Sequence, residues 1–377
     1  MFKSDLLFNG YYGYFNTGDD AFVEIANWGA TKFWEKNDIR FLIKGNNKPT
    51  TISPVKAFPL NLPYSYEIQQ NLLIKGTKAF VSAGGSTLNS RIETQRPKFL
   101  ALNRKLKDKR FVIGAIGVSV GPFKTKEDEI SIVKYLKNLN FLALRDVASF
   151  DYVDSLNLDY KPVLAFDLAG LLPEIYREFP NTDFALKSSS KKIICISVCN
   201  YESYFVGGNL ENQKRRNRLM RELLINLDNC RNDCHFKFII INGNPSTGDV
   251  NLTFELINKV GFKNNTFEVV PYDSSPKNVF HLISNCDLVL TIRLHAGIFA
   301  CFADVPFLMV EYHKKCSDFL SDIGYDDSFR MYDFSIELAL ALGKINNILD
   351  NKSNYIFPKH LDLMRLRSMK NFTSILF

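Results

Sequence analysis

A cation and an imidazole stand two positions apart in the segment from Thr291 to Gly297, which reads Thr-Ile-Arg-Leu-His-Ala-Gly. Arg293 and His295 follow an apolar run and precede a helix of small residues. Free amides at a helix start favour anions, and a guanidinium holds a carboxylate or phosphate with paired hydrogen bonds. The segment therefore predicts a receptor for a small phosphorylated or carboxylated substrate, with His295 as a catalytic group. A packed core histidine is the alternative.

Two further cationic groups follow predicted strands. Arg145 comes directly after the run 141–144, and Lys315 comes shortly after the run 307–310, together with His313. We expect Arg145 and Lys315 to face the same cleft as Arg293. A structural salt bridge between Arg145 and the adjacent Asp146 is the alternative for the first of them.

Acidic and aromatic residues gather near the N-terminus, between Gly10 and Asp20. Two carboxylates at one spot would repel phosphate, so a bare phosphate loop does not fit. We expect Asp19 to cap the following helix, and Asp20 and Asn16 to face a neutral sugar, with Tyr14 among three tyrosines that offer a ring. Asp20 is the expected general base. Simple capping by both aspartates is the alternative.

Glycine-rich segments end two more apolar runs, at 82–86 and 114–122. Glycine lets the backbone approach a ligand closely, although tight turns also collect glycine. Because ligands of parallel sheets bind beside the carboxyl ends of strands, both segments mark one crevice, with Gly85 and Gly117 as candidate contacts. Asp167 also follows a run, and capping is its alternative role.

Short apolar runs alternate with helical patterns along most of the 377 residues, which predicts βα units and parallel sheets. The pattern stops between about 176 and 192, restarts, and ends in a helix. We expect two Rossmann-like, doubly wound domains, at 1–178 and 191–350. The segment 176–192 is the expected linker, and the helix at 359–377 is expected to pack back on the first domain.

Composition narrows the class of protein. The net charge of +7, from 47 cationic and 40 anionic residues, suits an anionic substrate or surface, but long Lys/Arg tracts typical of nucleic-acid binding are missing. Seven cysteines without a dense framework indicate reduced thiols, and no ligand spacing indicates a metal. No leader or membrane-spanning run is present, so we expect a cytoplasmic protein. Peripheral membrane contact stays open, through the last helix or the basic segment 214–221.

Several of these motifs occur in one order that resembles the polysaccharide pyruvyl transferases, from about residue 10 to 325. The matching pieces are Gly13, Asn16 to Asp20, Ala83 to Gly85, Gly117, Gly121-Pro122, Arg145-Asp146, Ser149, Asp167, Arg293 to His295, Pro306, Tyr312 and Lys315. The resemblance implies two Rossmann-like domains in a GT-B arrangement with a cleft between them. It also implies transfer of pyruvate from phosphoenolpyruvate to two sugar hydroxyls as a cyclic ketal, with release of phosphate.

By the same resemblance, Arg293 and His295 fall where the family binds phosphoenolpyruvate, with Arg145, Lys315 and Gly117 on the donor side. Asn16, Asp19, Tyr14 and Gly85 are then expected on the acceptor side. The family's Tyr-Asp-Pro-Lys run is Tyr-His-Lys-Lys here, at 312–315. No cofactor or metal is expected, and the acceptor sugar, free or lipid-linked, is not identified by the sequence.

Ketal formation requires an acid over the alkene and cations on the donor. The hypothesis from the sequence gives the clamps to Arg293 and Arg145, and gives the acid or phosphate-partner role to His295. Two other functions suit the same motifs. One is a GT-B glycosyltransferase that uses a nucleotide sugar, and the other is a non-catalytic module that binds glycan or phosphate.

Overall fold

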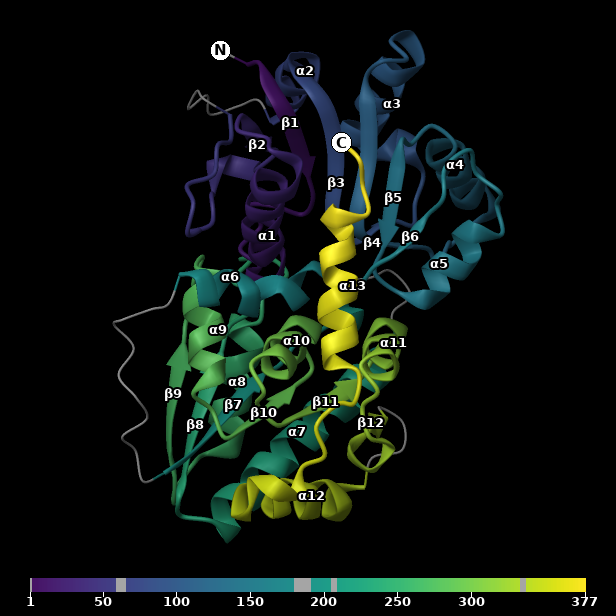
Figure 1. Cartoon of the computed structure of the whole chain (residues 1–377). Coiled ribbons are helices and arrows are strands. Elements are labelled where there is room, and N and C mark those ends of the chain that lie inside the picture. Colours follow the sequence, from purple (N-terminus) through teal and green to yellow (C-terminus); the bar gives the residue numbers. More distant parts are fainter. Residues whose placement is uncertain (1, 59–65, 180–190, 205–208, 333–336) are drawn as a thin grey trace.

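The protein folds as two α/β domains stacked on one another, each built on a six-stranded parallel sheet (Figure 1). The structure, a computed structural model, describes residues 2–58, 66–179, 191–204, 209–332 and 337–377. The expected fold class is therefore confirmed. The predicted linker falls largely on 180–190, outside the described residues.

The first sheet has the strand order β2-β1-β3-β4-β5-β6. Its strands are β1 (Ser4–Asn9), β2 (Ile39–Phe41), β3 (Thr77–Leu88), β4 (Val112–Val120), β5 (Phe141–Leu144) and β6 (Val163–Leu164). Its helices are α1 (Thr17–Trp34), α2 (Tyr66–Gly76), α3 (Arg96–Lys107), α4 (Lys126–Leu136), α5 (Val147–Asp154) and α6 (Leu172–Glu178). Helices cover both faces, which explains why the central strands are almost wholly apolar.

The second sheet has the order β12-β11-β10-β7-β8-β9. Its strands are β7 (Lys192–Ser197), β8 (Cys234–Ile239), β9 (Thr266–Val270), β10 (Leu288–Thr291), β11 (Phe307–Glu311) and β12 (Met331–Tyr332). Its helices are α7 (Leu210–Cys230), α8 (Val250–Val260), α9 (Pro276–Ser284), α10 (Leu294–Phe302), α11 (Lys314–Asp322) and α12 (Leu338–Asp350). The chain ends with α13 (Leu361–Thr373).

The apolar runs of the sequence coincide with ten of these strands, and the exceptions are β2 and β12. Both exceptions lie at sheet edges and have three residues and two residues. The strand β6 is also a two-residue edge strand, but it lies within the longer apolar run 163–166. Arg40 interrupts β2, and Arg330 and Asp333 flank β12, so neither of these strands stands out as an apolar run.

The start of α1 joins the two domains. The Thr17 amide donates to the Ile241 carbonyl (3.0 Å), and the Gly243 amide donates to the Phe15 carbonyl (2.8 Å). Asn16 forms an isolated antiparallel bridge with Asn242. The loop after β1 is therefore fixed against the loop after β8, and the domains meet where their strands end.

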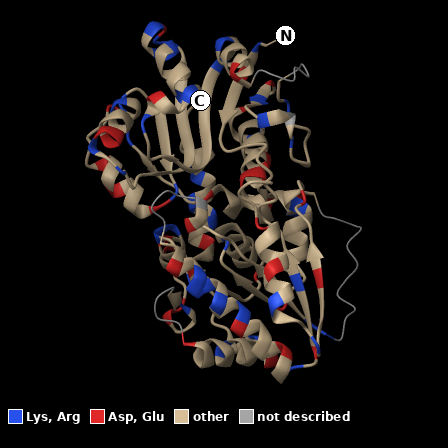
Figure 2. Cartoon of the chain, turned by 180° about the vertical axis from the view of Figure 1, so that it is seen from behind, with Lys and Arg blue, Asp and Glu red and all other residues tan. Residues whose placement is uncertain are grey.

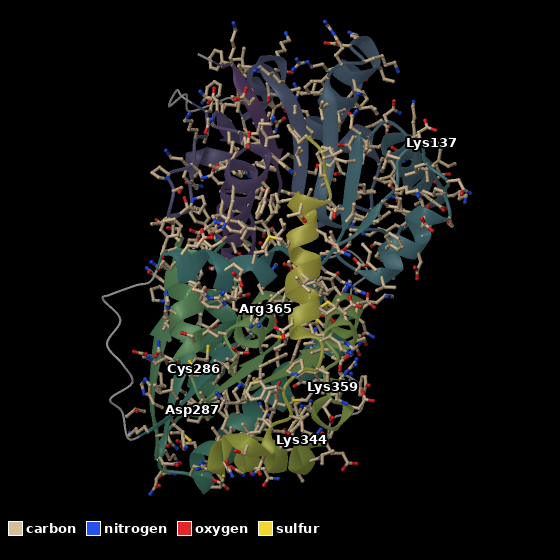
Figure 3. The ribbon with its side chains drawn as sticks, in the orientation of Figure 1. Lys137, Cys286, Asp287, Lys344, Lys359 and Arg365 are labelled. Carbon is tan, nitrogen blue, oxygen red and sulfur yellow. The ribbon has the colours of Figure 1, made fainter. Side chains whose placement is uncertain are left out.

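Helix α13 crosses from the second domain to the first (Figure 1). Asn371 accepts from the Gly117 amide (2.7 Å) and donates to the Phe166 carbonyl (2.9 Å). Arg365 lies on this helix (Figure 3), with its guanidinium 5.9 Å from the ring of Phe302. Polar side chains that satisfy buried backbone groups therefore help to hold the helix, beside its apolar contacts.

The buried face of α13 differs from the one that spacing predicts. Leu363 and Leu366 are 46% and 66% exposed, whereas Met364, Ser368 and Phe372 are buried. Of the four apolar residues at helical spacing, Phe372 and Met369 pack inward and the two leucines do not. The hydrogen bonds of Ser368 and Asn371 turn the helix toward its polar residues instead.

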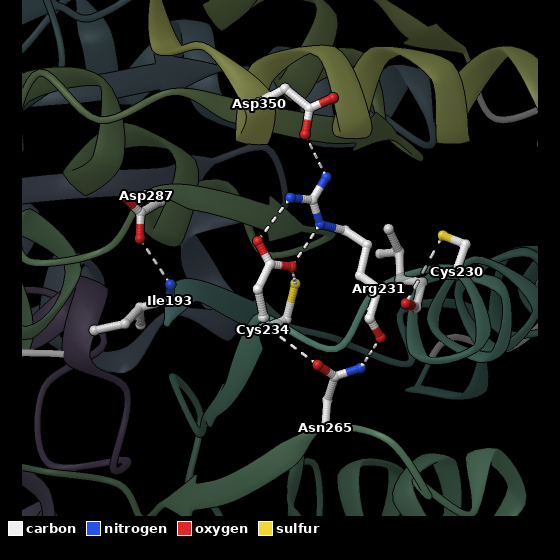
Figure 4. A network of polar contacts seen from close by, with 9 residues as sticks. Ile193, Cys230, Arg231, Cys234, Asn265, Asp287 and Asp350 are labelled. Atoms are coloured by element: carbon white, nitrogen blue, oxygen red, sulfur yellow. Dashed lines mark hydrogen bonds and ion pairs between the residues drawn. The ribbon is translucent and has the colours of Figure 1, made fainter. Parts of the chain in front are cut away.

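The far end of the second domain is held by a polar network (Figure 4). Asn265 accepts from the Cys234 amide (2.9 Å) and donates to the Arg231 carbonyl (2.7 Å). Arg231 also pairs with Asp350 of α12 (2.6 Å). All seven cysteines are free thiols, and within the described ranges no group of His, Cys, Asp and Glu has the arrangement of a metal site.

Charges of both signs are spread over both domains, as seen from behind in Figure 2. Among the helices of the described residues, none combines the length and apolar character needed to cross a lipid bilayer.

Candidate active site between the domains

A small cavity of about 180 Å³ lies between the domains, beside the ends of strands from both sheets. Seven of the residues expected from the sequence line it, three from the second domain and four from the first. They are Arg293, His295, Lys315, Asn16, Asp19, Gly85 and Arg145. Asp20, Tyr14 and Gly117 are not among its lining residues.

Arg293 is held by a carboxylate that the sequence did not single out. Its Nε donates to both oxygens of Asp249 (3.1 and 2.9 Å), and Nη2 also pairs with Asp249. Asp249 is fully buried just before α8, and it accepts from the Asn242 amide (3.0 Å). The described residues offer no partner to Nη1, so this edge of the guanidinium is available to a ligand. The loop after β8 is rich in Asn and Gly, like the other loops that follow strands at the cavity. This composition was the signal in the sequence that could have indicated Asp249.

Arg145 is fixed by three partners and is only 8% exposed. Nε donates to Ser119 Oγ (2.7 Å), Nη1 to Asp167 Oδ2 (3.0 Å) and Nη2 to Ser86 Oγ (2.9 Å). Asp167 therefore combines its expected capping role, at the Ala169 amide, with an ion pair. The ion-pair partner of Arg145 is Asp167, because Asp146 instead caps α5.

His295 lies in the first turn of α10, between aromatic rings. Its ring centroid is 5.2 Å from that of Phe22 and 6.5 Å from that of Phe299. Burial, together with the nearby Arg145 and Lys315, lowers the pKa of His295 to about 4. Its Nε2 is buried and has no partner among the described residues. A buried polar atom without a partner calls for an explanation, and a ligand in the adjoining cavity would supply one.

The N-cap of α1 is Asn16, not Asp19 as expected. Asn16 Oδ1 accepts from the Gly18 amide (3.1 Å), so the cap position precedes the two aspartates. Asp19 therefore lies within the first turn and faces the cavity. Burial and the neighbouring Asp20 raise the pKa of Asp19 to about 8, although Lys315 opposes this shift.

Asp20 faces away from the cavity. Its Oδ2 accepts from the Tyr272 hydroxyl (2.7 Å), and burial raises its pKa to about 7. Consecutive residues of a helix point about 100° apart, and here Asp19 lines the cavity while Asp20 does not. The structure therefore places Asp19, rather than Asp20, beside Arg145 and His295.

Lys315 reaches the cavity from the start of α11. Its Nζ lies 5.6 Å from the ring centroids of both Tyr312 and Tyr201. Burial lowers its pKa, and Arg145 and Arg293 act in the same direction. His313 caps α11, with its Nδ1 accepting from the Lys315 amide (3.1 Å). The loop that departs from the family pattern thus still delivers a lysine to the site.

Three remaining expected residues have different surroundings. Gly85 lines the cavity with a φ of +81°, which explains its residue type. Gly117 has its amide bonded to Asn371 of α13, so that amide is not free for a donor. Tyr14 stacks on Tyr11 at 3.9 Å between ring centroids, outside the cavity lining.

Solved structures of low sequence identity share this two-domain arrangement. A protein of Listeria monocytogenes named as a UDP-N-acetylglucosamine 2-epimerase matches with a TM-score of 0.62 and 10% identity, over 96% of this chain and 91% of that one. UDP-GlcNAc 2-epimerase of Neisseria meningitidis, bound to UDP-GlcNAc, matches with a TM-score of 0.53 and 10% identity, over 98% and 96%. At such identities the likeness shows the GT-B-like fold alone.

Sequence comparison gives a narrower result. No curated protein matches the chain. The family model described as polysaccharide pyruvyl transferase matches residues 16–314, a range that includes every described residue of the cavity apart from Lys315. The chain therefore belongs to the polysaccharide pyruvyl transferase family.

Proposed function

We propose that the protein transfers pyruvate from phosphoenolpyruvate to two hydroxyls of one sugar, forming a cyclic ketal and releasing phosphate. The sugar belongs to a cell-surface polysaccharide or its precursor. One observation carries the proposal: Arg145, Arg293 and Lys315 converge on a single cavity that also contains Asp19 and His295.

The charge of the cavity suits the donor. Phosphoenolpyruvate carries a carboxylate and a phosphate, and each hydrogen bond to a charged group contributes about 1.5–3 kcal/mol. A guanidinium has five N–H donors. Arg145 uses three of them on protein partners, and Arg293 keeps both Nη1 donors for a ligand. Because protein partners fix both guanidinium planes, little side-chain freedom is lost when the donor binds.

The reaction proceeds by addition and replacement at C2 of the donor. A proton adds to the methylene carbon, which becomes the methyl group, and the first sugar hydroxyl bonds to C2 as it loses its proton. The bond from C2 to the phosphate oxygen then breaks, and phosphate leaves with that electron pair. The second hydroxyl bonds to C2, loses its proton and closes the ketal. One donor and one diol thus give one ketal and one phosphate, without any oxidant or reductant.

Asp19 and His295 are the groups placed to move these protons. Asp19 is protonated at neutral pH because its pKa is raised to about 8, so it can supply the proton to the methylene carbon. His295 is neutral because its pKa is lowered to about 4, so it can accept a hydroxyl proton. The hypothesis from the sequence gave the acid role to His295. The negative charge of a bound donor raises the pKa of both Asp19 and His295. The pH profiles of variants at the two positions therefore have to decide which group is the acid.

Location at the cytoplasmic face of a membrane is a further part of the proposal. A groove of about 280 Å³ between α7 and α8 is lined by apolar side chains and by Lys214, Arg218, Arg221, Lys259 and Glu255. Glutamates pair with Lys214, Arg221 and Lys259, and the groove keeps an excess of cationic side chains. Arg216 of the same basic segment turns inward and pairs with Glu202, so it does not belong to this surface. Cations over apolar side chains suit anionic headgroups or a lipid-linked diphosphate. Flotation with anionic and neutral liposomes tests this point, and equal recovery with both would contradict it.

Ligand protection and product mass test the main proposal. A ligand at one hundred times its Kd stabilises the folded state by about 2.7 kcal/mol. We expect phosphoenolpyruvate to raise the melting temperature and UDP to leave it unchanged. With an acceptor panel, mass spectrometry should find the pyruvate ketal together with released phosphate. Protection by UDP alone would favour a nucleotide-sugar glycosyltransferase instead, and protection without phosphate release would favour a binding module.

A further inference from the structure

A second, larger cavity of about 320 Å³ adjoins the first. The two cavities share four lining residues, Ser86, Arg145, Leu294 and Lys315. From this boundary the second cavity extends between the exit of β4, the start of α5 and helix α11. Its volume falls within the range of small-molecule sites, about 300–1,000 Å³.

Aromatic rings form part of its wall. Phe123 and Tyr152 lie 5.5 Å apart between ring centroids, and Phe166 and Phe319 lie 6.3 Å apart. Tyr152 is held in place because its hydroxyl donates to Glu129 (2.9 Å). Fixed rings present apolar faces on which the C–H face of a sugar can pack.

Polar groups with unused hydrogen-bonding capacity line the same cavity. The carboxylate of Asp322 has no hydrogen-bond partner among the described residues, and burial and the nearby Asp146 raise its pKa to about 6. Asp146 uses Oδ1 on the Ser149 amide and retains Oδ2 as an acceptor. Because His313 Nδ1 accepts a hydrogen bond, its Nε2 carries the proton and serves as a donor.

The acidic residues also determine what the cavity excludes. Four carboxylates line it: Asp167 pairs with Arg145 (3.0 Å) and Asp318 with Lys314 (2.6 Å), whereas Asp146 and Asp322 have no ion-pair partner among the described residues. Unpaired carboxylates repel a diphosphate, whereas they accept hydrogen bonds from neutral hydroxyls. The second cavity also has three cationic side chains, but two of them, Arg145 and Lys314, are paired with its own carboxylates. Its neighbour has three cationic side chains and a single carboxylate, Asp19, so the balance of charge differs between the two cavities.

We propose that this second cavity is the acceptor subsite, and that it holds a neutral sugar ring whose two reacting hydroxyls point past Arg145 toward the donor. The inference rests on the proposed function. It moves the acceptor away from the expected contacts Asn16, Asp19 and Gly85, which line the donor cavity. Arg145 then lies at the junction of the two substrates, held by Ser119, Ser86 and Asp167.

Filling the second cavity tests the proposal. Ala148 lines it from an exposed position on α5, so Ala148→Trp adds bulk without disturbing a core. Ala339→Trp places the same side chain on an exposed position of α12 and serves as the matched control. The probes are p-nitrophenyl glycosides of neutral hexoses and N-acetylhexosamines, followed by saturation-transfer NMR and by ketal formation with phosphoenolpyruvate.

We expect the wild type and Ala339→Trp to bind at least one glycoside, and Ala148→Trp to lose that binding by tenfold or more. The rise in melting temperature that phosphoenolpyruvate causes should stay within twofold of the wild-type value in both variants. Asp322→Asn should weaken glycoside binding with Asp327→Asn as its exposed control.

The outcomes separate the two proposals. Suppose that the wild type binds a glycoside, that Ala148→Trp loses this binding, and that the wild type forms no ketal product. This result would support the sugar subsite and refute the pyruvyl transfer. Unchanged glycoside binding in Ala148→Trp would overturn the subsite, as would equal loss of phosphoenolpyruvate binding. Binding of UDP that Ala148→Trp abolishes, or no binding of any glycoside by the wild type, would also overturn it.

Discussion

Gly18 lies directly against the imidazole of His295, across the boundary between the two domains. A Cβ atom added to Gly18 would lie 2.1 Å from His295 Nδ1. The first turn of α1 therefore sets the position of the imidazole, and the residue type at Gly18 follows from this close approach.

Gly18→Ala should therefore damage catalysis. The added methyl group has to displace the ring, and misplacing a catalytic group by about 1 Å costs about a hundredfold in rate. Overpacking should also lower the free energy of unfolding by about 1–3 kcal/mol. Steady-state kinetics and chemical denaturation measure the two effects.

Gly343→Ala is the matched control for this substitution. Gly343 lies within α12, and a Cβ there would meet nothing within 4 Å. This variant should keep full activity and gain about 0.4–1 kcal/mol of stability. Full activity of Gly18→Ala would show that the position of His295 does not matter for turnover.

Asp249→Asn should weaken donor binding although Asp249 does not line the cavity. The change breaks a buried ion pair, which costs about 3–5 kcal/mol of stability, and frees Arg293 to rotate. We expect the KM for phosphoenolpyruvate to rise at least tenfold. Asp228→Asn is the control, because Asp228 is also buried and accepts from the amides of the loop at 263–265. It should lose stability and retain the KM, and a parallel rise in KM would mean that global destabilisation explains both variants.

Transfer should proceed in the presence of a chelator. Three cationic side chains converge on the donor cavity and can neutralise the charge that a divalent ion would otherwise balance. The assay is phosphate release with and without EDTA, and the control restores magnesium. A complete loss in EDTA that magnesium reverses would contradict this model of the cavity.

The sequence predicted which strand exits meet at the cavity between the domains, because parallel strands place their carboxyl ends at one edge. Arg145, Arg293, His295 and Lys315 all follow strands directly or by a few residues, and all four reach one cavity. This argument needs only the order of strands and loops. It works without any knowledge of side-chain contacts.

What the sequence could not predict depends on the orientation of a helix and on contacts between distant residues. Asp19 and Asp20 are adjacent, so one turn of α1 decides which of them faces the cavity, and the cap at Asn16 sets that turn. Asp249 lies 44 residues from Arg293 in the chain, and only the tertiary fold brings the start of α8 and the exit of β10 together. Neither the orientation of Asp19 nor the pairing of Asp249 with Arg293 can be seen in a short stretch of the sequence.

The pH dependence of kcat/KM should report Asp19 and His295. If Asp19 gives the proton to the donor, activity falls as pH rises above about 8, because the carboxyl loses its proton. If neutral His295 accepts a proton, activity falls as pH drops below about 4. Asp19→Asn should lower kcat by about 10²–10⁴ and remove the alkaline limb. An alkaline limb that persists in Asp19→Asn, and disappears in His295→Gln, would return the acid role to His295.

Asp20→Asn should change stability rather than catalysis. The folded pKa of Asp20 is raised to about 7 from an ordinary value of 3.8, so the folded state binds more protons than the unfolded state between these values. By linkage, this group lowers the free energy of unfolding as pH rises from about 4 to about 7. Asp20→Asn removes that loss, and Tyr272 can still donate to the amide oxygen. Denaturation at pH 5 and pH 8 should therefore show a smaller decline than in the wild type, with kcat within a few fold. Loss of transfer with unchanged stability would instead support Asp20 as the catalytic base.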